Sequence, residues 1–243
     1  MTKQTAIIIP ARYGSSRLEG KPLLEACGKP IIQWVWEKAK QTPLVDRVIV
    51  ATDDERIFNA CKQFGAEVEM TSTEHKSGSD RIAEVARRHP EIGYIINLQG
   101  DEPLIEQANI ELVIKGVKFD EKADISTLVR EIKDEDEVNN PNLVKCVFDF
   151  NNYAMYFSRS KIPFERNIGK SKFYGHLGIY GYKAKALFKM TELPQAPYEM
   201  SESLEQLRAL QNGMKIKVAV VENVPVGIDT QEDFEKFKRM VEE

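Results

Sequence analysis

Residues Ile7 to Leu23 read Ile-Ile-Ile-Pro-Ala-Arg-Tyr-Gly-Ser-Ser-Arg-Leu-Glu-Gly-Lys-Pro-Leu, a strand-like run followed by a polar loop. The apolar residues from Ala6 to Ile9 predict a short buried strand. Pro10 is expected to end this strand, because proline has no N–H group for the next hydrogen bond of the ladder. In an open α/β sheet, ligands bind just outside the carboxyl ends of the strands, so in such a fold the loop would lie at a binding site.

The loop from Ala11 to Pro22 combines cations, hydroxyl groups and glycines, namely Arg12, Arg17, Lys21, Ser15, Ser16, Gly14 and Gly20. Phosphate oxygens favour positive charge and free backbone N–H groups, so the loop is a candidate phosphate site; a solvated basic loop is the alternative. Neither common phosphate motif is present. The glycines are too far apart for G-x-G-x-x-G, and Gly20-Lys21 precedes proline where the Walker motif has Ser or Thr.

The composition is that of a globular protein. The chain has 243 residues, of which 42% are hydrophobic and 30% charged, and we predict one α/β domain over residues 1–243. The net charge of -4 argues mildly against non-specific binding to nucleic acids or membranes. Cys27, Cys61 and Cys146 are odd in number and lack metal-ligand spacing, which indicates a reducing compartment. No apolar segment approaches about 18 residues, so we predict a cytoplasmic protein without a membrane segment.

The first half of the chain alternates predicted strands and helices. Strands are expected at 47–52, 67–70 and 94–98, and helices at 31–42, 55–64 and 79–88. This alternation predicts a mainly parallel sheet with helices on both faces. From Ala123 the pattern becomes β-rich, with strands expected at 125–132, 144–150, 154–158, 176–182 and 216–221 and helices at 203–211 and 230–243. We interpret Ala123 as a subdomain boundary at most.

Two aspartates are candidate metal ligands. Asp101 lies in Gln99-Gly100-Asp101-Glu102-Pro103, directly after a buried strand, and Asp229 lies in Gly227-Ile228-Asp229-Thr230. Carboxylate oxygens suit magnesium, although one aspartate is not a metal site. The structural alternatives are a turn at Asp101 and a helix cap formed by Asp229 with Glu232.

Two other acidic or polar groups have simpler explanations. Asp53-Asp54 resembles a two-carboxylate metal motif, but Asp54 can also begin a helix. Ser77-Gly78-Ser79-Asp80-Arg81 opens a predicted helix, whose free N–H groups favour an anion. A serine cap explains most of this second motif and leaves Arg81 unexplained.

The strand His176 to Tyr182 carries a polar, aromatic face. Alternation places His176, Gly178, Tyr180 and Tyr182 on that face, which is either a packed sheet surface or a sugar or carboxylate pocket. His75 and His89 are expected at the surface. Ser203 to Gln206 reads as a capping box, which leaves Glu205 free for another role.

Together these motifs resemble the 3-deoxy-manno-octulosonate cytidylyltransferases, the CMP-Kdo synthetases of lipopolysaccharide biosynthesis. The resemblance runs nearly end to end and depends on Ile8 to Arg12, Gly20 to Leu23, Ala51 to Asp53, Ser77 to Arg81, Gln99 to Pro103, Tyr156 to Arg159, His176 to Tyr182, Leu204 to Arg208 and Gly227 to Thr230. It implies a Rossmann-like nucleotidyltransferase fold with a small β-rich dimerisation subdomain, and a homodimer.

The resemblance also implies an activity: transfer of CMP from CTP to the anomeric hydroxyl of an acidic eight-carbon sugar, with release of pyrophosphate and a requirement for Mg²⁺. Catalytic roles fall on Lys21, Asp101 and Asp229, of which the two aspartates hold the metal. The implied CTP contacts are Arg12, Ser15, Lys21, Ser79 and Arg81. The implied sugar contacts are Gln99, Arg159, His176, Tyr180, Glu205 and Gln206, with Arg159 as the partner of the sugar carboxylate.

The chain departs from the family pattern at Glu19, where proline is usual, and we expect this acid to point away from the phosphate loop. Ser79 replaces the common threonine and keeps the hydroxyl. Alternative activities are CMP activation of sialic acid or of an 8-amino Kdo analogue, and transfer from a nucleotide sugar, which would favour an Asp-x-Asp motif. A non-catalytic nucleotide-binding module is the remaining alternative.

Overall fold

The computed structural model describes residues 3–14, 18–222 and 227–242 and groups the chain into two compact units. Unit 1 comprises Met1–Glu111 and Pro225–Glu243, and unit 2 comprises Leu112–Val224. The prediction of one domain over the whole chain is not tested by this grouping and stays a prediction.

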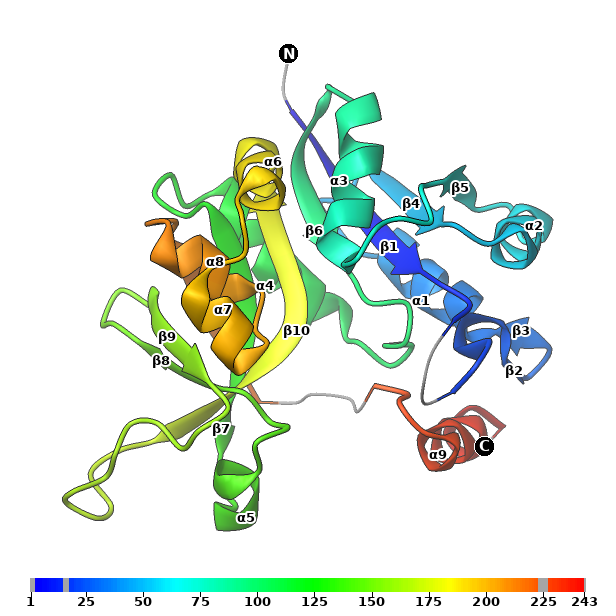
Figure 1. The fold of residues 1–243 in the computed structure, drawn as a ribbon. Helices are drawn as coiled ribbons and strands as arrows, with labels where there is room; N and C mark the ends of the chain where they lie inside the picture. The colour runs from blue at the N-terminus through cyan, green and yellow to red at the C-terminus, as the bar shows by residue number, and fades with distance from the viewer. Residues whose placement is uncertain (1–2, 15–17, 223–226, 243) are drawn as a thin grey trace. The chain divides into compact units, whose positions relative to one another are not determined.

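Unit 1 contains a parallel sheet in the strand order β6-β1-β4-β5. Its strands are β1 Gln4–Ala11, β4 Arg47–Thr52, β5 Glu67–Met70 and β6 Ile92–Asn97. Four consecutive residues of β1, Ala6 to Ile9, are fully buried, so both faces of the sheet are covered. Figure 1 shows α3 Gly78–Arg88 in front of β1. The predicted parallel α/β architecture is therefore confirmed for this half of the chain.

The other elements of unit 1 connect and flank these strands. They are the 3₁₀ helix Lys21–Leu23, the two-residue strands β2 Glu25–Ala26 and β3 Lys29–Pro30, and the helices α1 Ile31–Lys40, α2 Glu55–Gln63 and α9 Gln231–Glu242. The helix α4 Gln107–Lys118 crosses the boundary between the units. No helix was predicted at α4, although Ile110, Val113, Ile114 and Val117 repeat at helical spacing and are all fully buried.

The predicted stop at Pro10 is wrong, since β1 continues to Ala11 with Pro10 opposite Ala51 of β4. The carbonyl of Ile8 accepts a hydrogen bond from Leu98 on the β6 side. Residues two apart point the same way in a strand, so the missing N–H of Pro10 also faces that side. The β6 pairing has already ended at Ile8, so no ladder hydrogen bond is lost.

Unit 2 contains a mixed sheet. In it β7 Ile125–Ile132 pairs parallel with β11 Ile216–Val221 and antiparallel with β10 Phe173–Lys183. A hairpin of β8 Lys145–Phe148 and β9 Ala154–Ser158 joins the sheet through β10. The helices are α5 Glu135–Asn139, α6 Ala184–Glu192, α7 Pro197–Glu202 and α8 Gln206–Gln211. The predicted β-rich second part is confirmed, whereas helices α5, α6 and α7 were not predicted.

The capping box predicted at Ser203 is wrong. Ser203 has φ of 51° and ends α7 in the left-handed conformation, while Glu205 precedes the first residue of α8. The helix expected from Ser203 therefore begins later, at Gln206, as α8, and a tight turn separates it from α7.

Asp120 anchors one edge of unit 2 and gives a testable dependence of stability on pH. Burial would raise the pKa of this carboxyl, but hydrogen bonds from Tyr153, Lys217 and two backbone N–H groups lower it to about 2. Because the folded pKa lies below the unfolded value, the stabilisation is present above about pH 4 and is lost as the pH falls towards 2.

We therefore expect Asp120→Asn to lower the free energy of unfolding at pH 7 by about 1–2 kcal/mol, allowing for solvent screening. The difference in the free energy of unfolding between wild type and Asp120→Asn should narrow as the pH falls below about 4. Urea unfolding between pH 7 and pH 3 measures this difference. Tyr153→Phe removes one donor and should produce a smaller loss. A difference in unfolding free energy that stays constant over this pH range would contradict the stabilising role of the ionised Asp120 carboxyl.

Candidate active site

A cavity of about 410 Å³ opens at the carboxyl ends of β1 and β6 within unit 1. This is the edge at which the loop after the first strand was predicted to bind a ligand. Its lining consists of Pro10, Ala11, Arg12, Lys21, Pro22, His75, Lys76, Ser77, Gly78, Arg81, Gln99, Gly100, Asp101 and Asp229. Six of the predicted site residues share this cavity, namely Arg12, Lys21, Arg81, Gln99, Asp101 and Asp229.

Lys21 connects the two predicted metal ligands. Its Nζ donates to Asp101 Oδ2 at 2.6 Å and to the carbonyl of Ile228 at 2.7 Å, and it lies 3.4 Å from Asp229 Oδ1. The backbone N–H of Ile228 donates to the carbonyl of Asp101, which joins the two acidic segments directly. Three oxygen atoms from two distant segments thus converge on one cationic group.

A third acid, Glu102, responds to the negative charge of the two aspartates. Burial, and then the nearby charges of Asp101 and Asp229, raise the pKa of Glu102 to about 7. The acidic side of the cavity therefore disfavours further negative charge and attracts a cation.

The loop that carries Lys21 is held by a short chain of contacts. Gly20 has φ of 66°, and its N–H donates to the carbonyl of Tyr13 at 3.0 Å. The guanidinium of Arg56 lies 3.3 Å from the centre of the Tyr13 ring and is itself held by Asp54. A side chain at position 20 would meet the Tyr13 ring at 3.0 Å, so glycine is required both by the backbone and by this contact.

Glu19 is exposed and is not part of the cavity lining. Its charge acts on Arg56, whose pKa is raised chiefly by the hydrogen bond to Asp54 and further by Tyr13 and Glu19. The exposed position of Glu19 outside the cavity lining agrees with the expectation that this acid points away from the phosphate loop.

Gly20→Ala is expected to lower kcat/KM about tenfold, because a left-handed alanine costs roughly 1–2 kcal/mol and displaces Lys21 from its partners. The matched control is Gly14→Ala in the same loop, where an added Cβ meets nothing within 4 Å. Steady-state kinetics with both variants tests the assignment. Equal effects of the two substitutions would show that the backbone conformation of Gly20 is not what positions Lys21.

Arg81 is a buried cation held on two sides. Its NH2 group forms an ion pair with Asp53 Oδ2 at 2.6 Å, and its NH1 group donates to Thr71 Oγ1. Asp53 therefore pairs with an arginine, and Asp54 caps α2, as its helix-start alternative predicted. Arg81 still lines the cavity and presents a fixed positive charge there.

Ser77, rather than Ser79, is the hydroxyl at the cavity. Ser77 caps α3 by accepting from the N–H of Asp80, and it lines the cavity together with Gly78. Ser79 is buried in the first turn and is not in the lining. Ser15 lies outside the described residues. The cation Lys76 was missed, although its place directly before the Ser77 motif was a usable signal.

The alternative prediction that Asp229 and Glu232 form a helix cap is wrong. Asp233 accepts hydrogen bonds from the N–H groups of Asp229 and Thr230 and from the hydroxyl of Thr230. The N–H of Asp233 in turn donates to the Thr230 hydroxyl, so Thr230 and Asp233 form the reciprocal cap that was predicted for Asp229 and Glu232. The Asp229 carboxylate instead contacts Lys21.

Unit 2 brings several predicted sugar contacts together. The His176 and Tyr180 rings lie 5.2 Å apart, and the charge of Glu205 acts on the Tyr180 hydroxyl, whose pKa is raised mainly by burial. Burial lowers the pKa of His176 to about 3, so its ring is neutral at pH 7, and its Nε2 lies 3.0 Å from the Thr127 hydroxyl. Gln206 is buried in the first turn of α8.

The strict alternation predicted for this strand is interrupted. A register shift between Leu177 and Tyr180 forms a bulge, which leaves Gly178 exposed. The Tyr180 ring nevertheless lies between those of His176 and Tyr182, so the three aromatic residues form one row.

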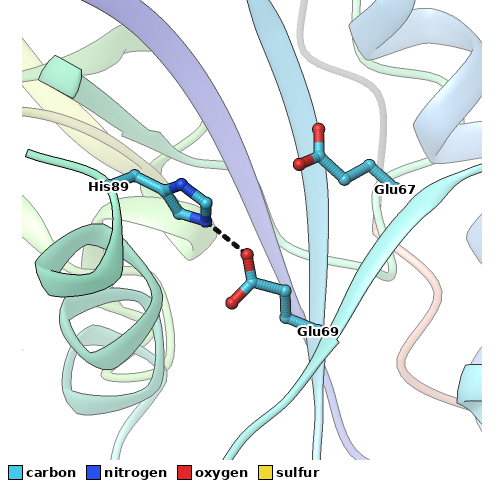
Figure 2. A group of neighbouring side chains, drawn as sticks. All are labelled: Glu67, Glu69 and His89. Carbon is cyan, nitrogen blue, oxygen red and sulfur yellow. Dashed lines mark hydrogen bonds and ion pairs between the residues drawn. The ribbon is translucent and has the colours of Figure 1, made fainter. Parts of the chain in front are cut away.

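Figure 2 shows a second group that could hold a metal ion, made of Glu67, Glu69 and His89, whose ligand atoms lie within 4.8 Å of one another. His89 contacts Glu69, while Arg47 and Arg88 pair with the two carboxylates. Arg47 and Glu67 begin their strands, so this group lies at the amino ends of the parallel strands, opposite the cavity. These arginines already neutralise the group, which we interpret as a surface ion-pair network.

A parallel α/β sheet with a cationic loop after its first strand and two carboxylates at the same edge is the arrangement expected of a nucleotidyltransferase. The family model described as cytidylyltransferase matches residues 6–216. The chain belongs to this family, and within it to the 3-deoxy-manno-octulosonate cytidylyltransferases.

Two relatives of that name illustrate the similarity. The chain is 50% identical to the protein of Thermodesulfovibrio yellowstonii, over 95% of each chain, and 47% identical to that of Fusobacterium nucleatum, over 97% of this chain and 96% of the relative. A solved structure of CMP:2-keto-3-deoxy-manno-octonic acid synthetase complexed with CTP matches with a TM-score of 0.95 and 42% identity, over 99% of both chains. The predicted nucleotidyltransferase fold is therefore confirmed.

Among the described residues, no helix is both long enough and apolar enough to cross a membrane.

Proposed function

We propose that this enzyme transfers CMP from CTP to the anomeric hydroxyl of 3-deoxy-manno-octulosonate (Kdo), releasing pyrophosphate and supplying CMP-Kdo for lipopolysaccharide biosynthesis. The observation that carries this proposal is the contact of Lys21 with both Asp101 and Asp229 in a cation-lined cavity. Close relatives named for this activity, and a matching structure complexed with CTP, support the choice of both substrates.

In the proposed reaction the anomeric oxygen forms a bond to the α-phosphorus as the bond to the β-phosphate oxygen breaks. The hydroxyl proton passes to solvent without a dedicated side-chain base, and pyrophosphate leaves. Attack at phosphorus needs mainly alignment and charge neutralisation from the protein. Arg12 and Lys21 neutralise the departing pyrophosphate, while Arg81 and the hydroxyl of Ser77 belong to the proposed nucleotide site. Ser15 remains a proposed contact of the nucleotide.

The donor set at the acidic side of the cavity fits magnesium. Asp101, Asp229 and the Ile228 carbonyl present hard oxygen atoms around one cationic group, which is the chemistry that Mg²⁺ prefers. Asp101 and Asp229 would hold the ion, which when bound supplies charge stabilisation at the phosphate oxygens. The Lys21 ammonium contacts both carboxylates, so a bound ion would compete with it for these oxygen atoms.

Arg159, His176, Tyr180, Glu205 and Gln206 form the proposed sugar-binding group of unit 2, and Gln99 is the proposed sugar contact from unit 1. Arg159 retains donors for a carboxylate, because its known hydrogen bonds use three of five N–H groups. The neutral His176 and the Tyr180 hydroxyl are suited to bind sugar hydroxyl groups.

A pyrophosphate-release assay tests the proposal directly. The four nucleoside triphosphates are each combined with Kdo, its 8-amino analogue and sialic acid. Fastest release with CTP and Kdo is expected, together with loss of activity in the presence of a chelator that magnesium restores. Faster turnover of another acid sugar would overturn the substrate assignment, and undiminished turnover in the chelator would overturn the role of magnesium.

We further propose a cytoplasmic homodimer. Unit 2 exposes large apolar side chains on β9 and α7, namely Met155, Tyr198 and Met200. Contact between the Tyr156 and Tyr198 rings joins these two elements. The free thiols of Cys27, Cys61 and Cys146 support a reducing compartment.

Met155→Glu combined with Met200→Glu is expected to convert the dimer to a monomer, because charges at an apolar contact must be desolvated. Sedimentation velocity measures the change, with Leu44→Glu as the control at an exposed apolar residue of unit 1. A wild-type protein that sediments as a monomer would contradict the proposal.

A further inference from the structure

Lys145 is a buried cation to which the proposed reaction assigns no role. It is the first residue of β8, and its side chain is fully buried. Its Nζ donates to the backbone carbonyls of Asn140, Leu143 and Arg159 at 2.9, 2.7 and 2.6 Å. Three carbonyl oxygens therefore enclose this ammonium group, and one of them belongs to the proposed partner of the sugar carboxylate.

The backbone of Arg159 is held from two directions. Lys145 binds its carbonyl, while its N–H donates to Glu202 Oε2 at 2.9 Å. Glu202 also accepts from the hydroxyl of Ser158 at 2.6 Å, which ties the carboxylate to the end of β9. The backbone of Arg159, directly after β9, thus cannot shift without breaking hydrogen bonds to both charged side chains.

The side chain of Arg159 forms further hydrogen bonds with the segment that leads into α8. Its Nε donates to the carbonyl of Glu202 at 2.7 Å, and its NH2 group donates to the carbonyl of Ser203 at 3.3 Å. The next residues are Leu204, Glu205 and Gln206, so the same arginine fixes the segment that carries two other proposed sugar contacts.

The charges of this group do not balance. Lys145 and Arg159 are cations and Glu202 is the carboxylate between them. The charges act on one another, since burial and Arg159 lower the pKa of Lys145 and Glu202 raises it. Among these three side chains one positive charge is in excess, and a substrate carboxylate can neutralise it.

We propose that Lys145 is a positioning residue for the acid sugar: it fixes Arg159 and, with it, the segment from Glu202 to Gln206, and it supplies the excess positive charge that selects a carboxylate-bearing acceptor. This inference rests on the proposed function, because it takes Arg159 as a sugar contact. Lys145 itself touches no substrate in this proposal.

The experiment compares the KM values of the two substrates in Lys145→Met. Loss of the ammonium is expected to raise KM for the acid sugar about tenfold or more while KM for CTP changes less than about twofold. Lys145→Gln keeps an N–H donor, so its KM for the acid sugar should rise less than that of Lys145→Met. The matched control is Lys183→Met, which removes another lysine of unit 2 that binds two backbone carbonyls, and both of its KM values should stay within about twofold of wild type.

A selective rise in KM for the acid sugar supports the positioning role. Equal rises in both KM values, or an unchanged KM for the acid sugar in folded protein, would overturn it. If Lys145→Met does not fold, Glu202→Gln is assayed instead, because it loosens Arg159 from the opposite side, and the same two outcomes apply.

Failure of the proposed function would be seen separately in the wild type. If wild type uses a different acid sugar, only the identity of the substrate is wrong, and the KM comparison is made with that sugar. If it uses no acid sugar, both the proposed function and this inference are overturned.

Discussion

Asp101→Asn and Asp229→Asn are each expected to reduce turnover by about 10³-fold or more, equivalent to roughly 4 kcal/mol of transition-state stabilisation. Asparagine keeps the size of the side chain but removes the negative charge that attracts a cation. Lys21 retains the Ile228 carbonyl and the other carboxylate in each variant, so the fold should persist. Steady-state turnover and urea unfolding are measured together.

Asp233→Asn is the matched control, since Asp233 lies four residues after Asp229 and caps α9 instead of facing the cavity. It should lower the free energy of unfolding by about 1 kcal/mol and leave turnover within about twofold. Near-normal activity in both cavity variants would refute the metal assignment. A raised magnesium requirement in either one would strengthen it.

The first half of the fold is predictable from the sequence because its signals are local. Arg47 to Thr52 and Glu67 to Met70 are strands with the predicted bounds, since short apolar runs between turn residues have no competing structure. The cap at Asp54 and the left-handed turn at Gly65 follow from side-chain chemistry within a few residues.

The contacts within the candidate site could be predicted only in part. The loop, Asp101 and Asp229 were each located, but the hydrogen bonds from Lys21 span 80 and 208 residues and depend on the fold. Asp229-x-x-Glu232 and Thr230-x-x-Asp233 have the same capping spacing, and the structure uses the second pair as the cap of α9. Lys145 gave no sequence signal at all, because a lysine that opens a strand is usually solvated.

Arg208→Met is expected to cost about 3–5 kcal/mol of unfolding free energy, the largest stability effect considered. Arg208 binds both carboxylate oxygens of Glu199, with Nε 2.8 Å from Oε2, and the two residues are only 9% and 5% exposed. The same arginine donates to the carbonyl of Met190 and so joins α6, α7 and α8. The loss should therefore also disturb Gln206, at the start of α8.

The cost arises because Glu199 would be left buried without its cation. Burial raises the pKa of Glu199, and Arg208 together with the N–H of Ala196 overcomes this effect in the wild type. Without Arg208 the folded pKa should exceed the unfolded value, so the penalty is largest at neutral pH and shrinks as the pH falls towards the range in which the carboxyl is protonated.

The double variant Glu199→Met with Arg208→Met should recover most of the lost stability, because replacing both charges by apolar groups removes the uncompensated carboxylate. Arg130→Met is the matched control: Arg130 binds Glu137 through two N–H groups in the same unit, but Glu137 is 40% exposed. Its loss should cost no more than about 1 kcal/mol. If urea unfolding gave equal losses for the two arginines, exposure would not determine the strength of these ion pairs, and the buried pair would not be what holds α8 in place.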